Sequence, residues 1–171
     1  MGINGARRKR PVLTIPPSPL ELGLEFFALL VLIAIFLLLV VNLPGLPDRI
    51  PTHFDALGRP DAYGNKMSLL LLPCVSLGLY LLLTVTARFP QSFNYPWAIT
   101  EENAERQYQM ARTMLRGLKL ELGLVMLYIL WVQIQSAQNN VSGLNIAFLP
   151  IVLVMIFGTI GFYLWVAARA R

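Results

Sequence analysis

Residues 22–41 read LGLEFFALLVLIAIFLLLVV, a run in which Glu25 is the one charged side chain. An α-helix rises 1.5 Å per residue, so about 20 residues cross a hydrocarbon core of about 30 Å. The segment is expected to be helical because that core holds no water to hydrogen-bond a bare backbone. This stretch therefore predicts a membrane-spanning helix.

Three further stretches, residues 67–86, 118–135 and 146–166, are similarly apolar. The whole chain of 171 residues is 56% hydrophobic and 13% charged, whereas soluble domains are about 45–50% apolar and about 25% charged. The third stretch contains Lys119 and Glu121, but both lie within a turn of its start. We therefore predict an all-α integral membrane bundle of four transmembrane helices, at about residues 20–42, 66–87, 100–136 and 146–168.

The basic residues predict the orientation of these helices. One side of the predicted membrane has only three of them, Arg49, Arg59 and Lys66. The other side has eleven: Arg7, Arg8, Lys9, Arg10, Arg88, Arg106, Arg112, Arg116, Lys119, Arg169 and Arg171. Positive charge concentrates in the cytoplasm, so both termini are predicted to be cytoplasmic in a multi-pass protein of the cell membrane. Since no basic stretch lies on a soluble domain, we expect no nucleic-acid partner.

Within this frame, residues 1–17 are expected to be a mobile basic tail that touches lipid headgroups, and residues 18–171 a single membrane domain. Ser18 and Glu21 form a capping box at the start of the first helix. Pro73 predicts a kink near residues 69–73 of the second. The third is expected to begin at Thr100, with an apolar face over residues 104–118. The cytoplasmic part of that helix, residues 100–117, either docks a partner or packs on the bundle.

Between the first two helices lies a polar segment, residues 44–66, which contains the sequence IPTHFDALGRPDAYGNK over residues 50–66. Prolines stiffen this segment and glycines permit turns with positive φ, so it is expected to be an ordered extracytoplasmic loop. It also holds His53, the one histidine of the chain, together with Asp55 and Asp61.

Three interpretations of this loop are open. His53, Asp55 and Asp61 could bind a divalent metal, although zinc sites at enzymes usually have three protein ligands. His53 could instead act as a general base or pH sensor, since the pKa of histidine is about 6.5. In the favoured interpretation the loop is structural and presents a recognition surface, with Phe54 anchored in the bundle and His53 and Asp55 on one side of an extended strand. We therefore expect no enzyme activity, no cofactor and no metal.

The loop also carries a family pattern. Its members here are Pro47, Ile50, Pro51, His53, Phe54, Gly58, Asp61 and Lys66, followed by Pro73 in the second apolar run. Residues 25–85 thereby resemble the domain of unknown function 1648, which also occurs in SdpI-type bacteriocin immunity proteins. The resemblance implies a bacterial or archaeal membrane protein and suggests an immunity role.

Two carboxylates, Glu25 and Glu121, lie inside predicted spans, where acids are costly and often functional. They could form the cytoplasmic end of a proton or ion path. Alternatively they reach headgroup water or pair with Lys119 or Arg116. The outer half of the membrane has no acid to continue a relay.

The leading hypothesis is a non-enzymatic immunity, resistance or accessory protein that binds a partner through residues 44–66 or 100–117. A transport or channel component that uses Glu25 and Glu121 is the alternative. A metal-binding protein or membrane enzyme centred on His53 is the third hypothesis. The expected partners are the lipid bilayer and either another protein or a second copy of the chain.

Overall fold

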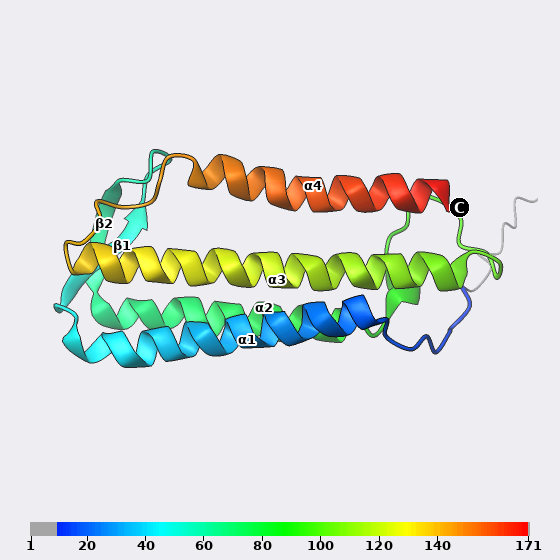
Figure 1. Cartoon of the computed structure of the whole chain (residues 1–171), viewed down its shortest axis with the longest axis horizontal. Helices are drawn as coiled ribbons and strands as arrows, with labels where there is room; N and C mark the ends of the chain where they lie inside the picture. Colours follow the sequence, from blue (N-terminus) through cyan, green and yellow to red (C-terminus); the bar gives the residue numbers. More distant parts are fainter. Residues whose placement is uncertain (1–9, 171) are drawn as a thin grey trace, which may run out of the picture.

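The computed structural model describes residues 10–170, and it is mostly helical (Figure 1). The long helices are α1 (Pro19–Asn42), α2 (Leu71–Thr86), α3 (Ala104–Ala137) and α4 (Phe148–Arg169). Four helical segments in this range, α2 counted with the 3₁₀ turn η2 (Lys66–Leu70), are long and apolar enough to cross a membrane. The prediction of a multi-pass membrane bundle is confirmed.

Helix α3 is the centre of the bundle, because α1, α2 and α4 all pack against it (Figure 1). The start of α1 and the end of α4 lie at the same end of the molecule, which we call the terminal end. We call the opposite end the hairpin end. The side of the membrane on which each end lies stays a prediction, made from the basic residues.

The best-buried apolar cluster lies at the hairpin end. Ile35 and Leu39 of α1 meet Leu130 and Ile134 of α3, and Ile50 enters from the segment between α1 and α2. In contrast, only 6% of the most apolar window of α4 is buried, against 28% for α3. Three helices and the hairpin therefore form the body of the protein, and α4 lies on it as an addition.

The segment between α1 and α2 contains an antiparallel β-hairpin that the sequence reasoning did not predict. Strand β1 (Arg49–Phe54) pairs with β2 (Pro60–Asn65), and the register shifts around His53. A 3₁₀ turn, η1 (Leu43–Gly45), ends α1 before the hairpin. The expectation of an ordered loop is thus confirmed in a more regular form.

The starts of α1 and α3 give one confirmed and one corrected expectation. Ser18 and Glu21 make both hydrogen bonds of the capping box, as predicted. Helix α3 begins at Ala104 and not at Thr100, because Asn103 Oδ1 accepts from the backbone N–H of Thr100 and stabilises a turn instead.

The kink predicted near Pro73 is instead a change of helix type. The 3₁₀ turn η2 (Lys66–Leu70) gives way to α2 at Leu71, so Pro73 falls within the first turn of α2. A proline there costs no internal hydrogen bond, because the first N–H groups of a helix have no intrahelical partner.

The expectation of a mobile tail is corrected for residues 10–17, while residues 1–9 lie outside the described residues. The side chain of Tyr108 donates to the carbonyl of Pro11, and Arg112 donates to the carbonyls of Ile15 and Pro16. Ala104 and Tyr108 on the apolar face of α3 are fully buried. This part of α3 therefore packs on the bundle and on the chain's own N-terminal segment.

A short 3₁₀ turn, η3 (Pro90–Ser92), follows α2 and extends this packing at the terminal end. The guanidinium of Arg10 donates to the carbonyls of Gln91 and Phe93 and lies over the ring of Tyr95. The α2–α3 connection and the N-terminal segment thus hold each other in place.

Candidate functional site

The turn of the hairpin is organised by Asp55. Its Oδ1 accepts from the backbone N–H groups of Leu57 and Arg59, both at 2.8 Å, and its own N–H donates to the carbonyl of Arg59. Such side-chain bonds to nearby backbone are the usual role of aspartate in turns. Asp55 is therefore engaged in shaping the turn.

These bonds make the turn sensitive to acid. The N–H of Arg59 holds the pKa of the Asp55 carboxyl below its ordinary value, with a further contribution from Leu57. Because the folded-state pKa is lowered, the stabilisation is present above the unfolded pKa of about 3.9 and is lost as the pH falls through the folded pKa. We expect the NMR shift of the Leu57 amide to titrate with a midpoint below 3.9. Asp55→Asn should abolish that titration, and a midpoint at or above 3.9 would contradict this account.

His53 pairs with Asp61 and not with Asp55. The distance from His53 Nδ1 to Asp61 Oδ1 is 2.6 Å, across the two strands, and both side chains are exposed. The register shift around His53 breaks the simple alternation of side chains that placed it beside Asp55. Within residues 10–170 no group of three His, Cys, Asp or Glu side chains is arranged to hold a metal ion.

The hairpin is fastened to the loop between α3 and α4. The N–H of Leu144 donates to the carbonyl of Gly58 at 2.8 Å. Gly58 has a φ of +81°, and Gly143 also has positive φ at 138°. A side chain at either glycine would overlap with backbone of the other segment. Both glycines are thus required for the close approach of two segments far apart in the sequence.

Replacing Gly58 by alanine should break this junction. The left-handed conformation costs about 1–2 kcal/mol for a residue with a Cβ, and the new methyl group would collide with the carbonyl of Leu144. We expect hydrogen exchange at the Leu144 amide to become at least about fivefold faster, the factor that 1 kcal/mol gives. Gly45→Ala is the matched control, because nothing lies within 4 Å of a Cβ there. Equal exchange in both variants would contradict the junction.

The two faces of the hairpin have different surroundings. Ile50 is fully buried in the core cluster, whereas Phe54, the predicted anchor, is only half-buried and lies outside that cluster. The anchor is therefore Ile50. Neighbouring residues of a strand point to opposite faces, so Arg49 and Pro51 lie on the other face, where Pro51 pairs with Tyr63 of β2.

That second face forms one wall of a recess of about 370 Å³ at the hairpin end. Arg49, Pro51 and Tyr63 line it from the hairpin, and Ser136 and Asn139 line it from the end of α3. Ligand pockets have volumes of about 300–1,000 Å³. The hydroxyl of Ser136 is buried there without a hydrogen-bond partner among the described residues.

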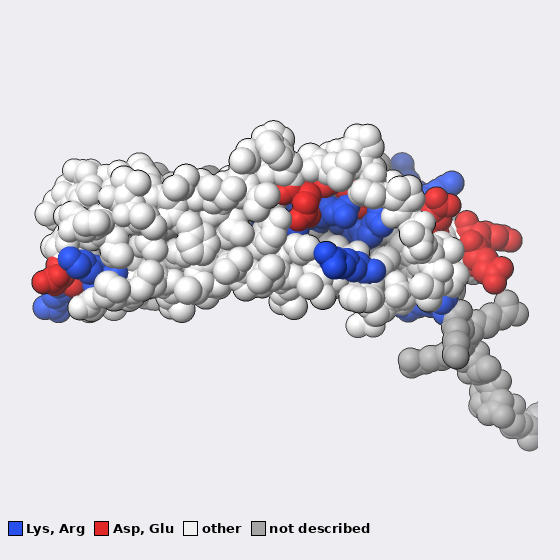
Figure 2. Space-filling model, turned by 90° about the horizontal axis from the view of Figure 1, so that it is seen from below, with Lys and Arg blue, Asp and Glu red and all other residues white. Residues whose placement is uncertain are grey.

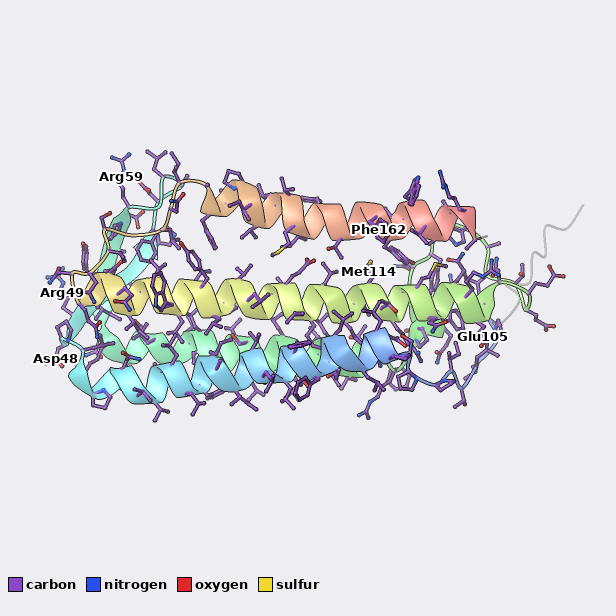
Figure 3. The ribbon with its side chains drawn as sticks, viewed as in Figure 1. Asp48, Arg49, Arg59, Glu105, Met114 and Phe162 are labelled. Carbon is purple, nitrogen blue, oxygen red and sulfur yellow. The ribbon has the colours of Figure 1, made fainter. Side chains whose placement is uncertain are left out.

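Among the described residues, the basic side chains at the hairpin end are paired with carboxylates except for Arg49. Lys66 Nζ lies 3.2 Å from Asp48 and also donates to the carbonyl of Leu46, while Arg59 lies 3.4 Å from Asp55. Arg49 has no carboxylate within ion-pair distance in the described part of the chain, and its guanidinium lies over the Tyr63 ring, 5.9 Å from the centroid. Figure 3 shows Asp48, Arg49 and Arg59 around this end of the molecule.

A second polar site lies between α1, α2 and α3 towards the terminal end. Lys119 Nζ contacts both carboxylate oxygens of Glu25 at 2.6 Å and Thr84 at 2.8 Å. The Tyr80 hydroxyl donates to Glu25 at 2.8 Å. The expectation that Glu25 pairs with Lys119 is confirmed, and Arg116 approaches the same carboxylate at 3.7 Å.

Glu21 completes this network one turn nearer the terminal end. Arg112 donates to its two oxygens at 3.1 and 2.9 Å, and Arg116 Nη1 lies 2.5 Å away as an ion pair without hydrogen-bond alignment. The side chain of Glu21 is fully buried. Figure 2 shows acidic and basic side chains side by side towards the terminal end, in a surface that is otherwise largely uncharged along the bundle.

Glu121 does not join this network. Its carboxylate accepts from the hydroxyl of Thr159 on α4, and its second oxygen is buried without a partner among the described residues. Residues two apart on a helix do not share a face, so Glu121 and Lys119 point to different neighbours. The structure therefore does not bring Glu25 and Glu121 together as one end of a path.

Arg116 was one of the two expected partners of Glu25, and it does approach that carboxylate. The sequence reasoning missed Glu21, Arg112, Tyr80 and Thr84 as members of the network, and Arg49 and Tyr63 as lining of the recess. One usable signal existed. Two acids, Glu21 and Glu25, are four residues apart on α1. Three bases follow one another at spacings of four and three on α3, namely Arg112, Arg116 and Lys119. Residues at these spacings share one face of a helix. Arg112 is buried although it is charged, because the carboxylate of Glu21 pairs with it.

Comparison with known proteins finds similarity in the part of the chain that contains the hairpin. The family model of the domain of unknown function DUF1648 matches residues 30–77. An uncharacterized protein of Archaeoglobus fulgidus is 39% identical over 95 residues, which cover 49% of this chain and 52% of the relative. The chain thus spans about half the length of that relative. No solved structure matches the chain significantly. The stretch that is similar to this family model, residues 30–77, contains the second half of α1, the hairpin and the start of α2 in a membrane protein.

Proposed function

We propose that this protein is a non-enzymatic accessory or immunity protein of the cell membrane, which binds a partner through its hairpin end. The single observation that carries the proposal is the recess, which is lined by Arg49 and by the exposed Tyr63. Arg49 has no ion-pair partner among the described residues, and the hairpin that carries both side chains is held by the core and by the α3–α4 loop. The resemblance to the domain of unknown function 1648, a domain that also occurs in SdpI-type immunity proteins, supports the immunity hypothesis.

Rigidity supports binding at this end. Ile50 holds one face of the hairpin in the core, and Gly58 holds its turn against the α3–α4 loop. The side chain of Gln133 on α3 also donates to the carbonyl of Thr52, at 3.4 Å. A surface that is already ordered loses little conformational freedom when a partner binds, and that loss is a main cost of association.

The chemistry of the hairpin end suits protein recognition. Tyrosine and arginine are the residues that most often dominate binding energy at interfaces, and both face the recess here as Tyr63 and Arg49. Leu57 at the turn is 48% exposed and Tyr63 is 53% exposed. No acidic side chain among residues 10–170 lines the recess, so a partner that presents a carboxylate is the best match.

The same observations weigh against the alternative functions. The carboxylate of Glu25 accepts hydrogen bonds from Lys119 and Tyr80, and these bonds hold α1, α2 and α3 together. The cavity beside it, between α1, α2 and α3, has about 20 Å³, space for about one water molecule. An ion path would need Glu25 to leave its partners, and an enzyme at His53 would need a nucleophile near it.

Photo-crosslinking in the native membrane tests the proposal. A photoreactive amino acid placed at position 63 or 57 should give a crosslinked product with one defined protein. The control position is 12, because Val12 is an exposed apolar residue at the terminal end. We expect no such product from position 12. Products from position 12 alone would move the binding surface to the terminal end and overturn the proposal.

A further inference from the structure

Helix α4 is attached to α3 at three places. At the terminal end the amide of Gln107 donates to the carbonyls of Ala167 and Ala170, at 2.9 and 3.1 Å. Near the middle Glu121 accepts from Thr159. At the hairpin end the rings of Tyr128 and Phe148 stack with centroids 5.2 Å apart. Between these attachment points the two helices leave space.

That space forms two grooves between α3 and α4. The groove nearer the terminal end has about 320 Å³ and lies between Met110 and Met114 of α3 and Phe162 and Val166 of α4, with Leu20 of α1 at its edge. Met114 and Phe162 lie on facing parts of the two helices (Figure 3). The groove nearer the hairpin end has about 360 Å³.

The two grooves differ in charge. Among the residues that the structure describes, no charged side chain lines the groove near the hairpin end, where Asn145 supplies an amide. The groove near the terminal end is lined by Arg106, with Gln109 and Thr113 on the same helix, and by no acid of residues 10–170. Arg106 is exposed and has no carboxylate within ion-pair distance among the described residues.

This combination matches one kind of occupant. An apolar groove with a cation and hydrogen-bonding groups near its end is complementary to a phospholipid. The apolar part matches an acyl chain, and the cation matches the anionic headgroup. Basic pockets between transmembrane helices on the cytoplasmic side are typical sites for anionic lipid headgroups. The basic residues also predict that the terminal end is cytoplasmic, where the leaflet is rich in such lipids.

We propose that the groove between α3 and α4 at the terminal end binds one anionic phospholipid, with the phosphate on Arg106 and an acyl chain between Met114 and Phe162. The lipid fills the space that the three attachment points leave and holds α4 against the body of the bundle. The proposal is independent of the function proposed for the hairpin end, because the two sites share no residue.

The test is lipid binding to the purified chain in a mild detergent, measured by native mass spectrometry. Phosphatidylglycerol and phosphatidylcholine with identical acyl chains are the probes. We expect one phosphatidylglycerol per chain and a preference of about fivefold over phosphatidylcholine, the factor that one arginine near an anionic headgroup provides. Arg106→Gln should bring the preference close to one.

Arg88→Gln is the matched control, because Arg88 is also an exposed cation near the terminal end and does not line the groove. It should keep the preference. A second variant, Met114→Phe, fills the groove and leaves the charge, so it should lower binding of both lipids. An unchanged preference in Arg106→Gln would overturn the proposal. So would a lipid-free dimer, which would show that a second copy of the chain covers this face of α4.

Discussion

Replacing Glu21 by alanine should cost about 3–5 kcal/mol in free energy of unfolding, the usual effect of removing one partner of a buried ion pair. Glu21 is fully buried, and its carboxylate neutralises the guanidinium groups of Arg112 and Arg116. Without it two cations remain in a low-dielectric environment. The change also removes the capping box at the start of α1, which is worth about another 1 kcal/mol.

Reversible unfolding of the protein in mixed micelles measures this loss. Glu101→Ala is the control, since Glu101 is an exposed acid at the same end and forms no ion pair among the described residues. Surface changes of that kind stay within about 0.5 kcal/mol. If Glu21→Ala were as mild as the control, water would have to reach Arg112 and Arg116, and the network would not be buried.

The second large effect concerns the pair of Lys119 and Glu25. Lys119→Leu should destabilise the protein by about 2–3 kcal/mol, because Glu25 loses both contacts to the ammonium group while its side chain is still 31% exposed and close to Arg116. The double variant Glu25→Leu with Lys119→Leu should recover most of that loss. Replacing a buried ion pair by apolar side chains is often neutral or stabilising.

The same unfolding assay applied to the two single variants and the double variant gives the coupling energy of the pair. Thr84→Val is a useful companion, because it removes one hydrogen bond to Lys119 and leaves the ion pair in place. It should cost about 1 kcal/mol. A double variant as unstable as Lys119→Leu alone would mean that packing around the lysine, and not its charge, holds the helices together.

These expectations describe carboxylates that lock helices together. Glu21 and Glu25 belong to α1, their cationic partners belong to α3, and Tyr80 and Thr84 add α2. The network therefore joins the three helices that form the body of the protein. None of the network residues named here comes from helix α4, which is attached to α3 through Gln107, Glu121 and Tyr128.

The membrane spans could be predicted from sequence because the requirement for about 20 apolar residues is local. The start of α1 could be predicted for the same reason, since Ser18 and Glu21 lie within one turn. The hairpin could not. Each strand contains a proline, Pro51 or Pro60, and Tyr63 is the one residue of β2 that favours strands. The hairpin is also stabilised by contacts to α3 and to Leu144 that no local pattern shows.

The candidate sites were only partly predictable for a related reason. Glu25 stood out as an acid in a span, and Lys119 was one of its two expected partners. The placement of His53 failed because a register shift turns it towards Asp61. The sequence did not single out Arg49 as a candidate site residue. Arg49 has no carboxylate partner among the described residues because Asp48 and Asp55 pair with Lys66 and Arg59, and only the folded chain decides those pairs.

The central claim is that the hairpin end recognises a partner. Native mass spectrometry of the protein, extracted gently from its own membrane, tests it most directly when wild type is compared with a Leu57→Ser, Tyr63→Ser double variant. Both positions are exposed, so the variant should fold normally. We predict a second protein bound to the wild type and lost from the variant, while a control variant, Val12→Ser, retains it. A partner that stays bound to the hairpin variant, or a wild-type chain with no protein partner, would contradict the account.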